Sequence, residues 1–405
     1  MDVKEQDRQY IMGTYKRQDL LIVRGKGAVC WDENGREYID FGSGIGVNSL
    51  GYCNEAWTEA VSRQAAMLQH ASNLYYTEPD VKLAKLLCES TGYRKALFCN
   101  SGAEANECAI KLARKYSFDK YGKDANRNKI LCLKNSFHGR TVTTLSATGQ
   151  DVFHNYYFPF TEGFEFAAAN DLEGVKEKLD EGGFCAVMFE FIQGEGGVVP
   201  LTREFVSGLF ELCAARDILT IADEVQTGIG RTGRLLASQC FPAASGGCVK
   251  PDLTTLAKGL GGGLPIGAVI AGEKACNVFG YSDHGTTFGG NPVVCAGAYA
   301  ALTQISDENF LAEVRRKGDL LKGCLLRMDE VEAVDGLGMM LGVRLKTKKA
   351  ADVAAACIQK GVIPLTAKEK IRLLPPLSIT ESELKRGIAL LGEVLESNSA
   401  EKAGA

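Results

Sequence analysis

Six short runs of apolar, β-prone residues constrain the fold of this chain more than any other feature. Each run is apolar at nearly every position, and a turn or a helical pattern follows it. Strands buried on both faces of a parallel sheet have this composition. The runs are KALFC (95–99), ILCL (130–133), FCAVMFE (184–190), ILTIAD (218–223), LTTLA (253–257) and GAVIA (267–271). This alternation predicts an α/β, doubly wound domain with a mostly parallel sheet between helices.

The pattern changes near Asn291, where long helical stretches begin to dominate. Helices are expected at 203–216, 292–305, 308–330 and 350–360, with short strands near 341–345 and 371–374. A smaller α+β C-terminal domain follows from this change. We therefore predict three parts: an N-terminal segment (1–54) that packs with the small domain, a large domain (55–290) and the small domain (291–405).

Two local signals refine these elements. Asn34-Gly35 lies between β-prone residues and is typical of a type I′ hairpin turn. Thr380 and Glu383 have the spacing of a capping box, which predicts that the last helix begins there.

Charge and cysteine usage exclude several classes of protein. Lys+Arg is 46 and Asp+Glu is 50, and the resulting net charge of −4 disfavours a nucleic-acid partner. No apolar run is long enough for a membrane span and the first residues do not form a secretory signal, so we expect a cytoplasmic protein. Several of the 14 cysteines lie inside apolar runs, and no CxxC pair occurs. They are expected to be buried free thiols, and no metal is expected.

Four stretches could carry chemistry, and the first is CNSGAEANECAIKLA (99–113). A strand ends there, and Ser101 with Glu104 predicts a capped helix start. Gly102 and Ala103 are small enough to let an anion approach the free N–H groups of the first turn. The stretch fits a phosphate site and an ordinary capped helix equally well.

The second stretch, ILTIADEVQTGIGRTG (218–233), places Asp223 and Glu224 at the end of a buried strand. Such strand ends are where open α/β sheets bind ligands, and a carboxylate there could hold a cation or a protonated ring nitrogen. A plain strand-to-loop transition would also place acidic residues there. The GIGRTG segment lacks the spacing of the common nucleotide-binding loops.

The third and fourth stretches are LTTLAKGLGGGLPIGAVIAG (253–272) and NSFHGRT (135–141). Lys258 directly follows a buried strand, where shielding from water could make it a nucleophile. Phe137 could stack on a planar ring and Arg140 could bind a carboxylate. Alone, each stretch could also be a solvated loop. Together they supply an anion cradle, a buried carboxylate, an amine and an aromatic plate, which is the set that pyridoxal phosphate needs.

With these motifs in place, the chain resembles the class III, fold type I pyridoxal-phosphate aminotransferases over its whole length, and within them the acetylornithine/ornithine aminotransferase group. The motifs that carry the resemblance are NSGAEANE, NSFHGRT, IQGEGG, DEVQTGIGRTG, TTLAKGLGGGLPIGA, DHGTTFGGNP and IRLLPPL. The resemblance implies a homodimer with active sites at the subunit interface. It also implies that the large domain binds the pyridoxal 5′-phosphate.

The resemblance assigns cofactor roles by motif. Lys258 would bind the cofactor covalently and move the proton, while Asp223 would pair with its ring nitrogen. Gln226 would contact the ring hydroxyl, Phe137 would cover one face, and Thr287 would reach the phosphate of the neighbouring subunit. The phosphate would lie at the helix start formed by Ser101, Gly102 and Ala103.

The resemblance also assigns substrate roles. Arg140 and Arg372 would bind carboxylates, and Glu195 would neutralise Arg372 when a substrate has only one. Thr286 would lie beside the substrate, and Tyr15 would line the pocket entrance.

The substrate implied by the resemblance is an acylated ornithine. Ile45 stands where enzymes that take free ornithine commonly have tyrosine, which favours N2-acetyl-L-ornithine. The implied reaction moves its δ-amino group to 2-oxoglutarate, an amino donor and 2-oxo acid pair of arginine biosynthesis. Alternatives are succinylornithine, ornithine, 4-aminobutyrate or N-acetyllysine as substrate, and, more distantly, an inactive binding protein. The chain departs from the family pattern at Phe191 and at 50–55, where it reads LGYCNE.

Overall fold

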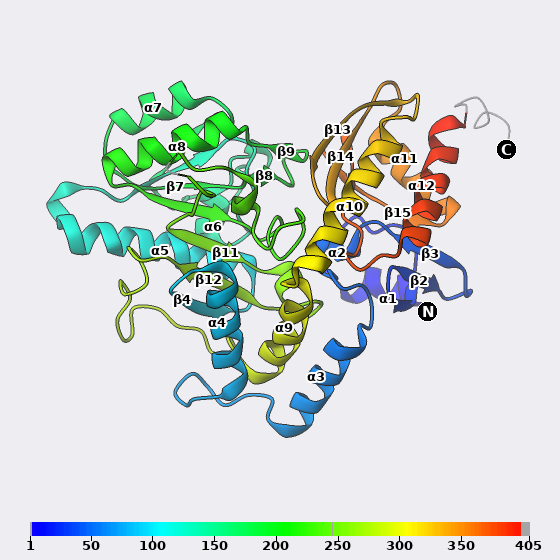
Figure 1. The fold of residues 1–405 in the computed structure, drawn as a ribbon, viewed down its shortest axis with the longest axis horizontal. Helices are drawn as coiled ribbons and strands as arrows, with labels where there is room; N and C mark the ends of the chain where they lie inside the picture. Colours follow the sequence, from blue (N-terminus) through cyan, green and yellow to red (C-terminus); the bar gives the residue numbers. More distant parts are fainter. Residues whose placement is uncertain (1, 245, 398–405) are drawn as a thin grey trace.

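A seven-stranded sheet forms the centre of the larger lobe in the computed structural model, which describes residues 2–244 and 246–397 (Figure 1). All six predicted runs are strands of this sheet, and the edge strand β6 is an addition that the sequence analysis missed. The strand order is β4 (Lys95–Cys99), β12 (Gly267–Ala271), β11 (Leu253–Leu256), β10 (Leu219–Asp223), β7 (Phe184–Phe189), β5 (Lys129–Leu133) and β6 (Phe164–Ala167).

One strand of the sheet runs against the others. β12 pairs antiparallel with both of its neighbours, β11 and β4, while the pairs from β11 to β6 are parallel. The carboxyl ends of the parallel strands therefore meet at one edge of the sheet, where α/β proteins bind their ligands. The chain has an α/β fold with a mostly parallel sheet, as the sequence predicts.

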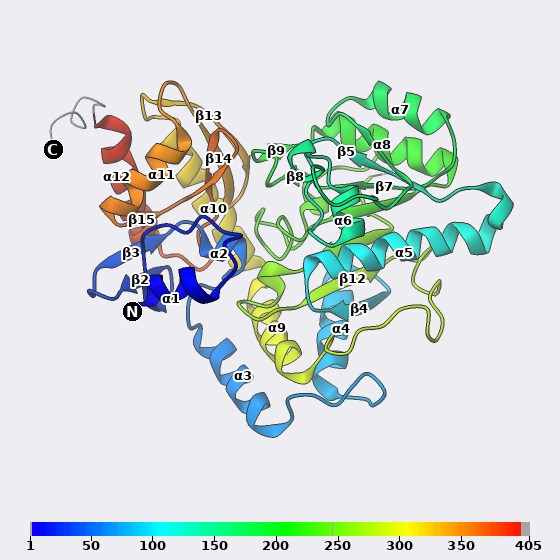
Figure 2. The same cartoon turned by 180° about the vertical axis from the view of Figure 1, so that it is seen from behind.

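Helices cover both faces of the sheet, as the two views show (Figures 1 and 2). α5 (Gly102–Tyr121) packs on one face, and its buried side chains share a core with Ile130 and Val269. α7 (Leu172–Asp180) and α8 (Arg203–Arg216) pack on the other face, around Phe189 and Val187. The all-apolar strands are thus explained by burial on both sides.

Two smaller sheets form the other lobe (Figure 1). The N-terminal strands β1 (Ile22–Lys26), β2 (Val29–Asp32) and β3 (Glu37–Asp40) join the C-terminal strand β15 (Val362–Ile363). The second sheet has the order β13 (Val331–Leu337), β14 (Met340–Leu345), β17 (Lys370–Leu373) and β16 (Leu365–Ala367). The chain's first and last segments therefore share one sheet.

Helices surround these sheets and connect the lobes. α3 (Glu55–Met67) and α4 (Glu78–Thr91) pack against α9 (Pro292–Ile305). α10 (Glu308–Leu325), α11 (Ala350–Lys360) and α12 (Glu381–Glu396) complete the C-terminal part, and the predicted capping box of Thr380 and Glu383 is present. The predicted division at 54 and 290 stays a prediction, and residues 398–405 of its last part lie outside the described residues.

The shorter elements connect these parts. The short helices are α1 (Val3–Tyr10), α2 (Ser43–Gly46), α6 (Val142–Ala147), η1 (Lys123–Ala125), η2 (Asp151–Phe153), η3 (Ala237–Cys240) and η4 (Lys258–Leu260). The strands β8 (Ile192–Gln193) and β9 (Val199–Pro200) form a separate two-stranded ribbon.

Two local expectations were wrong. The helix expected over 308–330 ends at Leu325, because the residues from Val331 alternate between buried and exposed and pair as a strand. The hairpin between β2 and β3 forms, but its turn is not type I′, which needs positive φ at both central residues. The carboxylate of Asp32 accepts hydrogen bonds from the N–H groups of Asn34 and Arg36, and within Asn34-Gly35 only Gly35 has positive φ.

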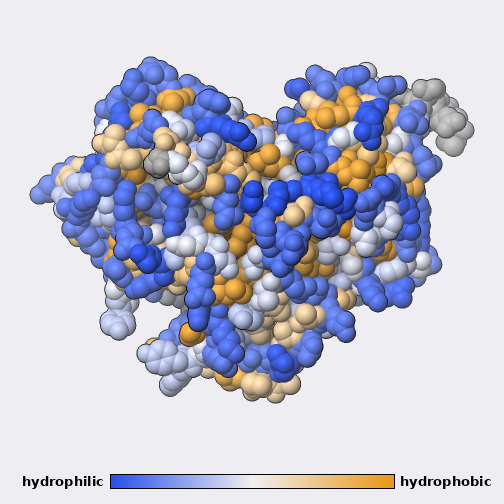
Figure 3. All heavy atoms as spheres, in the orientation of Figure 1, coloured by the Kyte–Doolittle hydropathy of each residue, from blue (hydrophilic) through white to orange (hydrophobic). Residues whose placement is uncertain are grey.

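The surface has a notch between the lobe of α7 and α8 and the lobe of β13 and β14 (Figure 3). In the described part of the chain, no helix combines the length and the apolar character needed to cross a bilayer. All 14 cysteines are free, and most of those inside strands and helices are buried, as predicted.

Candidate active site

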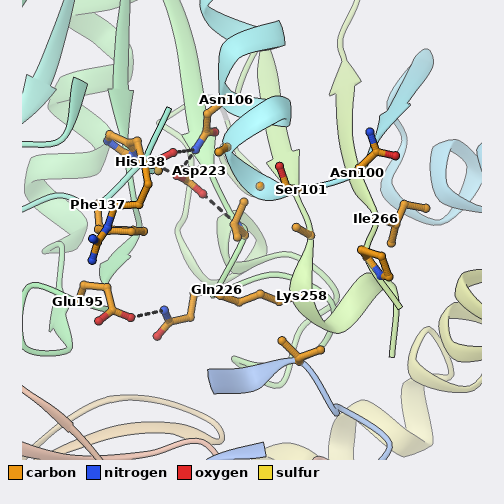
Figure 4. A pocket seen from close by; sticks show the side chains of 18 of the residues that line it. Asn100, Ser101, Asn106, Phe137, His138, Glu195, Asp223, Gln226, Lys258 and Ile266 are labelled. Atoms are coloured by element: carbon orange, nitrogen blue, oxygen red, sulfur yellow. Dashed lines mark hydrogen bonds and ion pairs between the residues drawn. The ribbon is translucent and has the colours of Figure 1, made fainter. Parts of the chain in front are cut away.

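The predicted strand ends converge on a cavity of about 460 Å³ (Figure 4). It is lined by polar side chains from several elements together with the helix start at Ser101. The lining residues used below are Asn100, Ser101, Gly102, Ala103, Asn106, Phe137, His138, Arg140, Glu190, Glu195, Asp223, Val225, Gln226 and Lys258. The sequence predicts eight residues that bind the cofactor or act in catalysis. Seven of them line this cavity, and Thr287 does not.

Lys258 enters the cavity directly after β11, at the first residue of η4. Its φ of 43° is in the left-handed region, which is costly for a residue with a Cβ and is found most often at functional sites. Burial lowers the pKa of the Lys258 ammonium, and the opposing charges of Glu195 and Asp223 restore only part of the shift. A larger fraction of the amine is therefore neutral near pH 7 than for a solvated lysine, as a nucleophile or base requires.

Asp223 is the last residue of β10 and belongs to a buried hydrogen-bonded group. Its Oδ2 accepts from Asn106 Nδ2 at 2.8 Å and lies 2.8 Å from His138 Nδ1. Against a carboxylate, that ring nitrogen carries the proton and donates. Asn106 Nδ2 also donates to the carbonyl of His138 at 2.7 Å, and Thr255 Oγ1 donates to Asn106 Oδ1 at 2.7 Å. Asp223 is thus held in one orientation by donors from Asn106 and His138.

Glu190 is a buried carboxyl that the sequence analysis did not single out. It directly follows β7, and its Oε2 accepts from the N–H of Phe137 at 3.1 Å. Its Oε1 accepts from the N–H of Gly194 at 3.2 Å. Burial raises the pKa of Glu190, and the nearby Asp223 charge adds to that rise. An acidic residue at the end of an apolar strand is the sequence pattern that could have identified Glu190. Its two hydrogen bonds hold the loops that carry Phe137 and Glu195.

The start of α5 forms one end of the cavity. Ser101 Oγ accepts from the N–H of Glu104 at 3.2 Å, as predicted for a cap. The return bond from Glu104 goes to the N–H of Asn100 at 2.7 Å, so only half of the expected capping box forms. A Cβ at Gly102 would lie 2.8 Å from Val225, so the site admits only glycine without rearrangement. The N–H groups of the first turn have no partners within a helix and face this end of the cavity.

Arg372 comes from β17 and brings the C-terminal part of the chain to the site. It is buried, and its Nη1 lies 2.5 Å from Glu195 Oε1 and 3.2 Å from Gln226 Oε1. Gln226 Nε2 donates to the same Glu195 oxygen at 3.4 Å (Figure 4). Burial acts to raise the pKa of Glu195, but the Arg372 charge and hydrogen bond outweigh it, so the net pKa is lowered. The Glu195–Arg372 pair is therefore ionised near neutral pH.

Arg140 lies at another wall of the cavity and is exposed. Its guanidinium carbon is 4.4 Å from the ring centre of Phe153 and 5.6 Å from that of Phe137. These aromatic faces orient the cation while leaving its N–H groups available to a carboxylate.

Five predicted substrate or cofactor residues lie outside the lining of this cavity. One is Arg372, which reaches the cavity only through its contacts with Glu195 and Gln226. Tyr15 is 76% exposed and Ile45 is 43% exposed, and Val47 lines the cavity instead. Thr286 Oγ1 accepts from Asn100 Nδ2 at 2.9 Å, and Thr287 lines a separate cavity of about 760 Å³. Their roles stay predictions.

Across 2–244 and 246–397, no group of three or more His, Cys, Asp or Glu side chains could hold a metal ion.

Comparisons with known proteins were made with the whole chain. The sequence model of the family described as Aminotransferase class-III matches residues 11–395. An acetylornithine aminotransferase of Haemophilus ducreyi is 50% identical over 97% of this chain and 98% of its own length. A succinylornithine transaminase of Yersinia pseudotuberculosis is 40% identical over 96% of this chain and 95% of its own. The crystal structure of an ornithine aminotransferase from Toxoplasma gondii superposes with a TM-score of 0.91 at 33% identity, covering 97% and 94% of the two chains.

Proposed function

Because the chain belongs to the class-III aminotransferases, we propose that it transfers the δ-amino group of N2-acetyl-L-ornithine to 2-oxoglutarate. The products are N-acetylglutamate 5-semialdehyde and L-glutamate. The two relatives at 40–50% identity support an acylated ornithine as the amino donor, since they are named for acetylornithine and succinylornithine, whereas the ornithine aminotransferase is 33% identical. The place of this reaction would be arginine biosynthesis.

The family depends on pyridoxal 5′-phosphate, and the cavity suits that cofactor. The N–H groups at the start of α5 match a phosphate, and Gly102 lets this helix start lie against Val225, where a Cβ would come within 2.8 Å of the valine side chain. Asp223 presents a carboxylate held by neighbouring donors, Phe137 offers a ring face, and Lys258 offers an amine. The groups of the cofactor therefore each have a counterpart on the cavity wall.

Each of these residues would hold one part of the cofactor. Ser101, Gly102 and Ala103 would bind the phosphate, Asp223 the ring nitrogen, Gln226 the ring hydroxyl and Lys258 the aldehyde carbon. When bound, pyridoxal phosphate supplies a carbonyl that takes up the amino group and a protonated ring that withdraws electrons from the substrate carbon. Asp223 would accept a hydrogen bond from the ring nitrogen, because its buried carboxylate is held in place by Asn106 and His138.

Lys258 has two tasks in this proposal. Its Nζ would hold the aldehyde carbon of the cofactor, and as a free amine it would remove a proton from the substrate carbon that bears the amino group. Its lowered pKa lets it accept that proton and return it without a large energetic cost.

The Glu195–Arg372 pair is the observation that carries the choice of substrates. Glutamate has two carboxylates, whereas N2-acetylornithine has one. Arg140 is free to bind the carboxylate that both share, and Arg372 would bind the second carboxylate of glutamate. When acetylornithine is bound, Glu195 neutralises Arg372 across 2.5 Å. Arg372 Nε is buried without a hydrogen-bond partner among the described residues, and a second carboxylate would supply one.

The assembly is also a proposal. We expect a homodimer in which Thr287 completes the partner's phosphate site, since Thr287 is exposed and lies outside the cavity of its own subunit. A cytoplasmic location and the absence of nucleic-acid and membrane partners remain expectations.

A single-turnover screen of amino donors tests the proposal. The cofactor-loaded enzyme is mixed with N2-acetylornithine, N2-succinylornithine, ornithine or 4-aminobutyrate, and loss of the visible band of the lysine-bound cofactor is followed. N2-Acetylornithine should give the highest kcat/KM. A tenfold preference for N2-succinylornithine, ornithine or 4-aminobutyrate over N2-acetylornithine would overturn the choice of substrate while leaving the aminotransferase activity in place.

A further inference from the structure

A second cavity of about 310 Å³ shares Arg140 with the first. Its lining is apolar and aromatic apart from Arg140 itself and two tyrosine hydroxyls. The lining residues are Arg140, Val142, Leu145, Val152, Phe153, Tyr156 and Tyr157. Arg140 is the one charged side chain in this set, and the set contains no carboxylate.

Arg140 connects the two cavities. Its guanidinium carbon lies over the Phe153 ring at 4.4 Å, and Phe153 in turn contacts Phe137 edge to face at 5.9 Å. A ligand whose carboxylate binds Arg140 therefore has one cavity with Lys258 on its wall and a second cavity with an aromatic wall within reach.

Residues 151–158, which we call the aromatic loop, form most of the second wall. One polar contact holds it on α6: His154 Nε2 lies 3.0 Å from the carbonyl of Leu145. Just beyond the loop, the N–H of Thr161 donates to Ser146 Oγ at 3.0 Å. The apolar side chains of the loop are nevertheless open to solvent, with Val152 at 68% and Tyr156 at 80% exposure. Clustered exposed apolar groups next to a polar anchor are typical of a ligand site.

We propose that the second cavity binds the acyl group on the α-nitrogen of the amino donor, and that it selects small, uncharged acyl groups. This inference rests on the proposed function, because it assumes that an N2-acylated ornithine binds with its carboxylate on Arg140. The α-carbon then lies at the boundary of the two cavities. From there the side chain extends toward Lys258 and the acylamide extends along the aromatic loop.

Charge explains the expected selectivity. A succinyl group would bring a second carboxylate into a lining whose one cation already binds the α-carboxylate. Free ornithine would bring an ammonium group next to that same cation, with no carboxylate in the lining to offset the repulsion. An uncharged acyl group avoids both costs and buries its carbon atoms against the aromatic rings.

Size gives a graded expectation. The cavity is about ten times the roughly 30 Å³ that one water occupies in the liquid, so an acetyl group does not fill it. Each further methylene is only partly buried in this open cavity and should raise kcat/KM about threefold, which corresponds to about 0.65 kcal/mol, against about 0.8 kcal/mol for a fully buried methylene. N2-Butyrylornithine should therefore exceed N2-acetylornithine by about tenfold.

The test compares donors in single turnovers with three forms of the cofactor-loaded enzyme. Val152→Trp fills the cavity, and Val23→Trp is the matched control because Val23 is also exposed, at 59%, but lies on β1 and lines neither cavity. The measured quantity is the ratio of kcat/KM for N2-butyryl- and N2-acetylornithine. We expect this ratio to fall from about ten to one or below in Val152→Trp and to stay near ten in Val23→Trp.

A second measurement does not depend on the reaction. N2-Butyryl-L-norvaline carries the carboxylate and the acyl group but no δ-amine, so it can bind without reacting. Its Kd, measured by fluorescence titration, should rise about tenfold in Val152→Trp and remain unchanged in Val23→Trp.

The possible outcomes separate the two proposals. If acylated ornithines react but Val152→Trp leaves the ratio at about ten, the acyl subsite is wrong and the proposed function stands. If glutamate reacts but no acylated ornithine does, both are wrong. A preference for N2-succinylornithine over N2-acetylornithine would overturn the charge argument. Dissociation of the oligomer in Val152→Trp would show that a second copy of the chain covers this cavity, which also overturns the proposal.

Discussion

Two walls of the active-site cavity are built in opposite ways. The Asp223 wall consists of Asp223, Asn106 and His138, which are buried and joined by hydrogen bonds of 2.7–2.8 Å. The Arg140 wall consists of Arg140 and the aromatic loop, which are largely exposed and are held by ring contacts and by the polar contact of His154 with the Leu145 carbonyl. The Asp223 wall holds one carboxylate in a fixed position, whereas the Arg140 wall presents an exposed surface whose side chains can be substituted.

The difference follows from what each wall must do. A buried carboxylate is stable only if its oxygens have donors, so each member of the Asp223 wall restricts the others. An exposed aromatic surface carries no such requirement, and substitutions there cost little stability. Chemistry that many substrates share is therefore expected at the rigid wall, and the choice among substrates at the open one.

The largest effect should come from removing the amine next to the rigid wall. Lys258→Ala should abolish the visible band of the lysine-bound cofactor and lower turnover by about 10⁴-fold, the upper end of the usual range for a general base. Absorption spectra and single-turnover rates measure both. Lys134→Ala is the matched control, because Lys134 also directly follows a strand, β5, but is exposed. A retained band in Lys258→Ala would refute the assignment.

The next effect concerns the charge of the rigid wall. Asp223→Asn should keep the shape of the side chain but remove its charge, and turnover should fall by about 10²–10³-fold. The control is Asp252→Asn, which alters a carboxylate at the opposite end of the neighbouring strand β11, where it accepts from Thr220 at 2.9 Å. That control should change stability rather than turnover. Near-normal rates in Asp223→Asn would contradict the role given to this wall.

A smaller effect, which differs between the two half-reactions, is expected from Glu195. Glu195→Gln leaves Arg372 without its neutralising partner at 2.5 Å. The N2-acetylornithine half-reaction should therefore slow about tenfold more than the glutamate half-reaction, which corresponds to about 1.4 kcal/mol. Rapid mixing of each substrate with the loaded enzyme measures the two rates.

The control for this substitution is Glu165→Gln, which breaks a partly exposed pair with Lys129 far from the cavity lining. It should leave the ratio of the two half-reactions unchanged. Equal slowing of both half-reactions in Glu195→Gln would argue against the neutralising role.

The smallest effects are expected in the free energy of unfolding, which should fall more for a substitution in the Asp223 wall than for one in the Arg140 wall. Asn106→Ala removes donors from Asp223 and from the His138 carbonyl, and should lower the free energy of unfolding by about 2–3 kcal/mol. Tyr156→Ala, at 80% exposure in the native side chain, should change it by no more than about 0.5 kcal/mol. Urea unfolding of the cofactor-saturated protein compares them. Equal losses in the two variants would show that the walls do not differ as described.

The sequence predicted the rigid elements well and their mutual arrangement less well. The strands at 95–99 and 267–271 and the helices at 203–216 and 350–360 have the predicted bounds, because local apolar patterns specify them. An apolar run has no direction, however, so the reversal of β12 could not be read from it.

The same limit applies to the active site. Lys258, Asp223 and Phe137 could be placed because each follows a recognisable strand. Asn106 bonds to Asp223 across 117 positions in the chain, and no local pattern marks such a partner. Glu190 was missed for a different reason. Its position suggested only the end of a strand, whereas its role depends on the N–H groups of Phe137 and Gly194, which no local pattern connects to it.

The reversed strand β12 limits how the chain around Lys258 can change in length. β11 and β12 are neighbours that pair from Leu253–Ala271 to Leu256–Ala268, so residues 257–266 form a closed connection between two fixed ends. Crossovers between parallel strands can gain residues on the surface without moving the strand ends. Residues inserted into 257–266 cannot be accommodated in this way, because both ends of the segment are fixed by strand pairing, so they would displace Lys258. Deletions, tags and loop grafts should therefore be tolerated least in this segment, so efforts to redesign substrate choice should work on the aromatic loop instead.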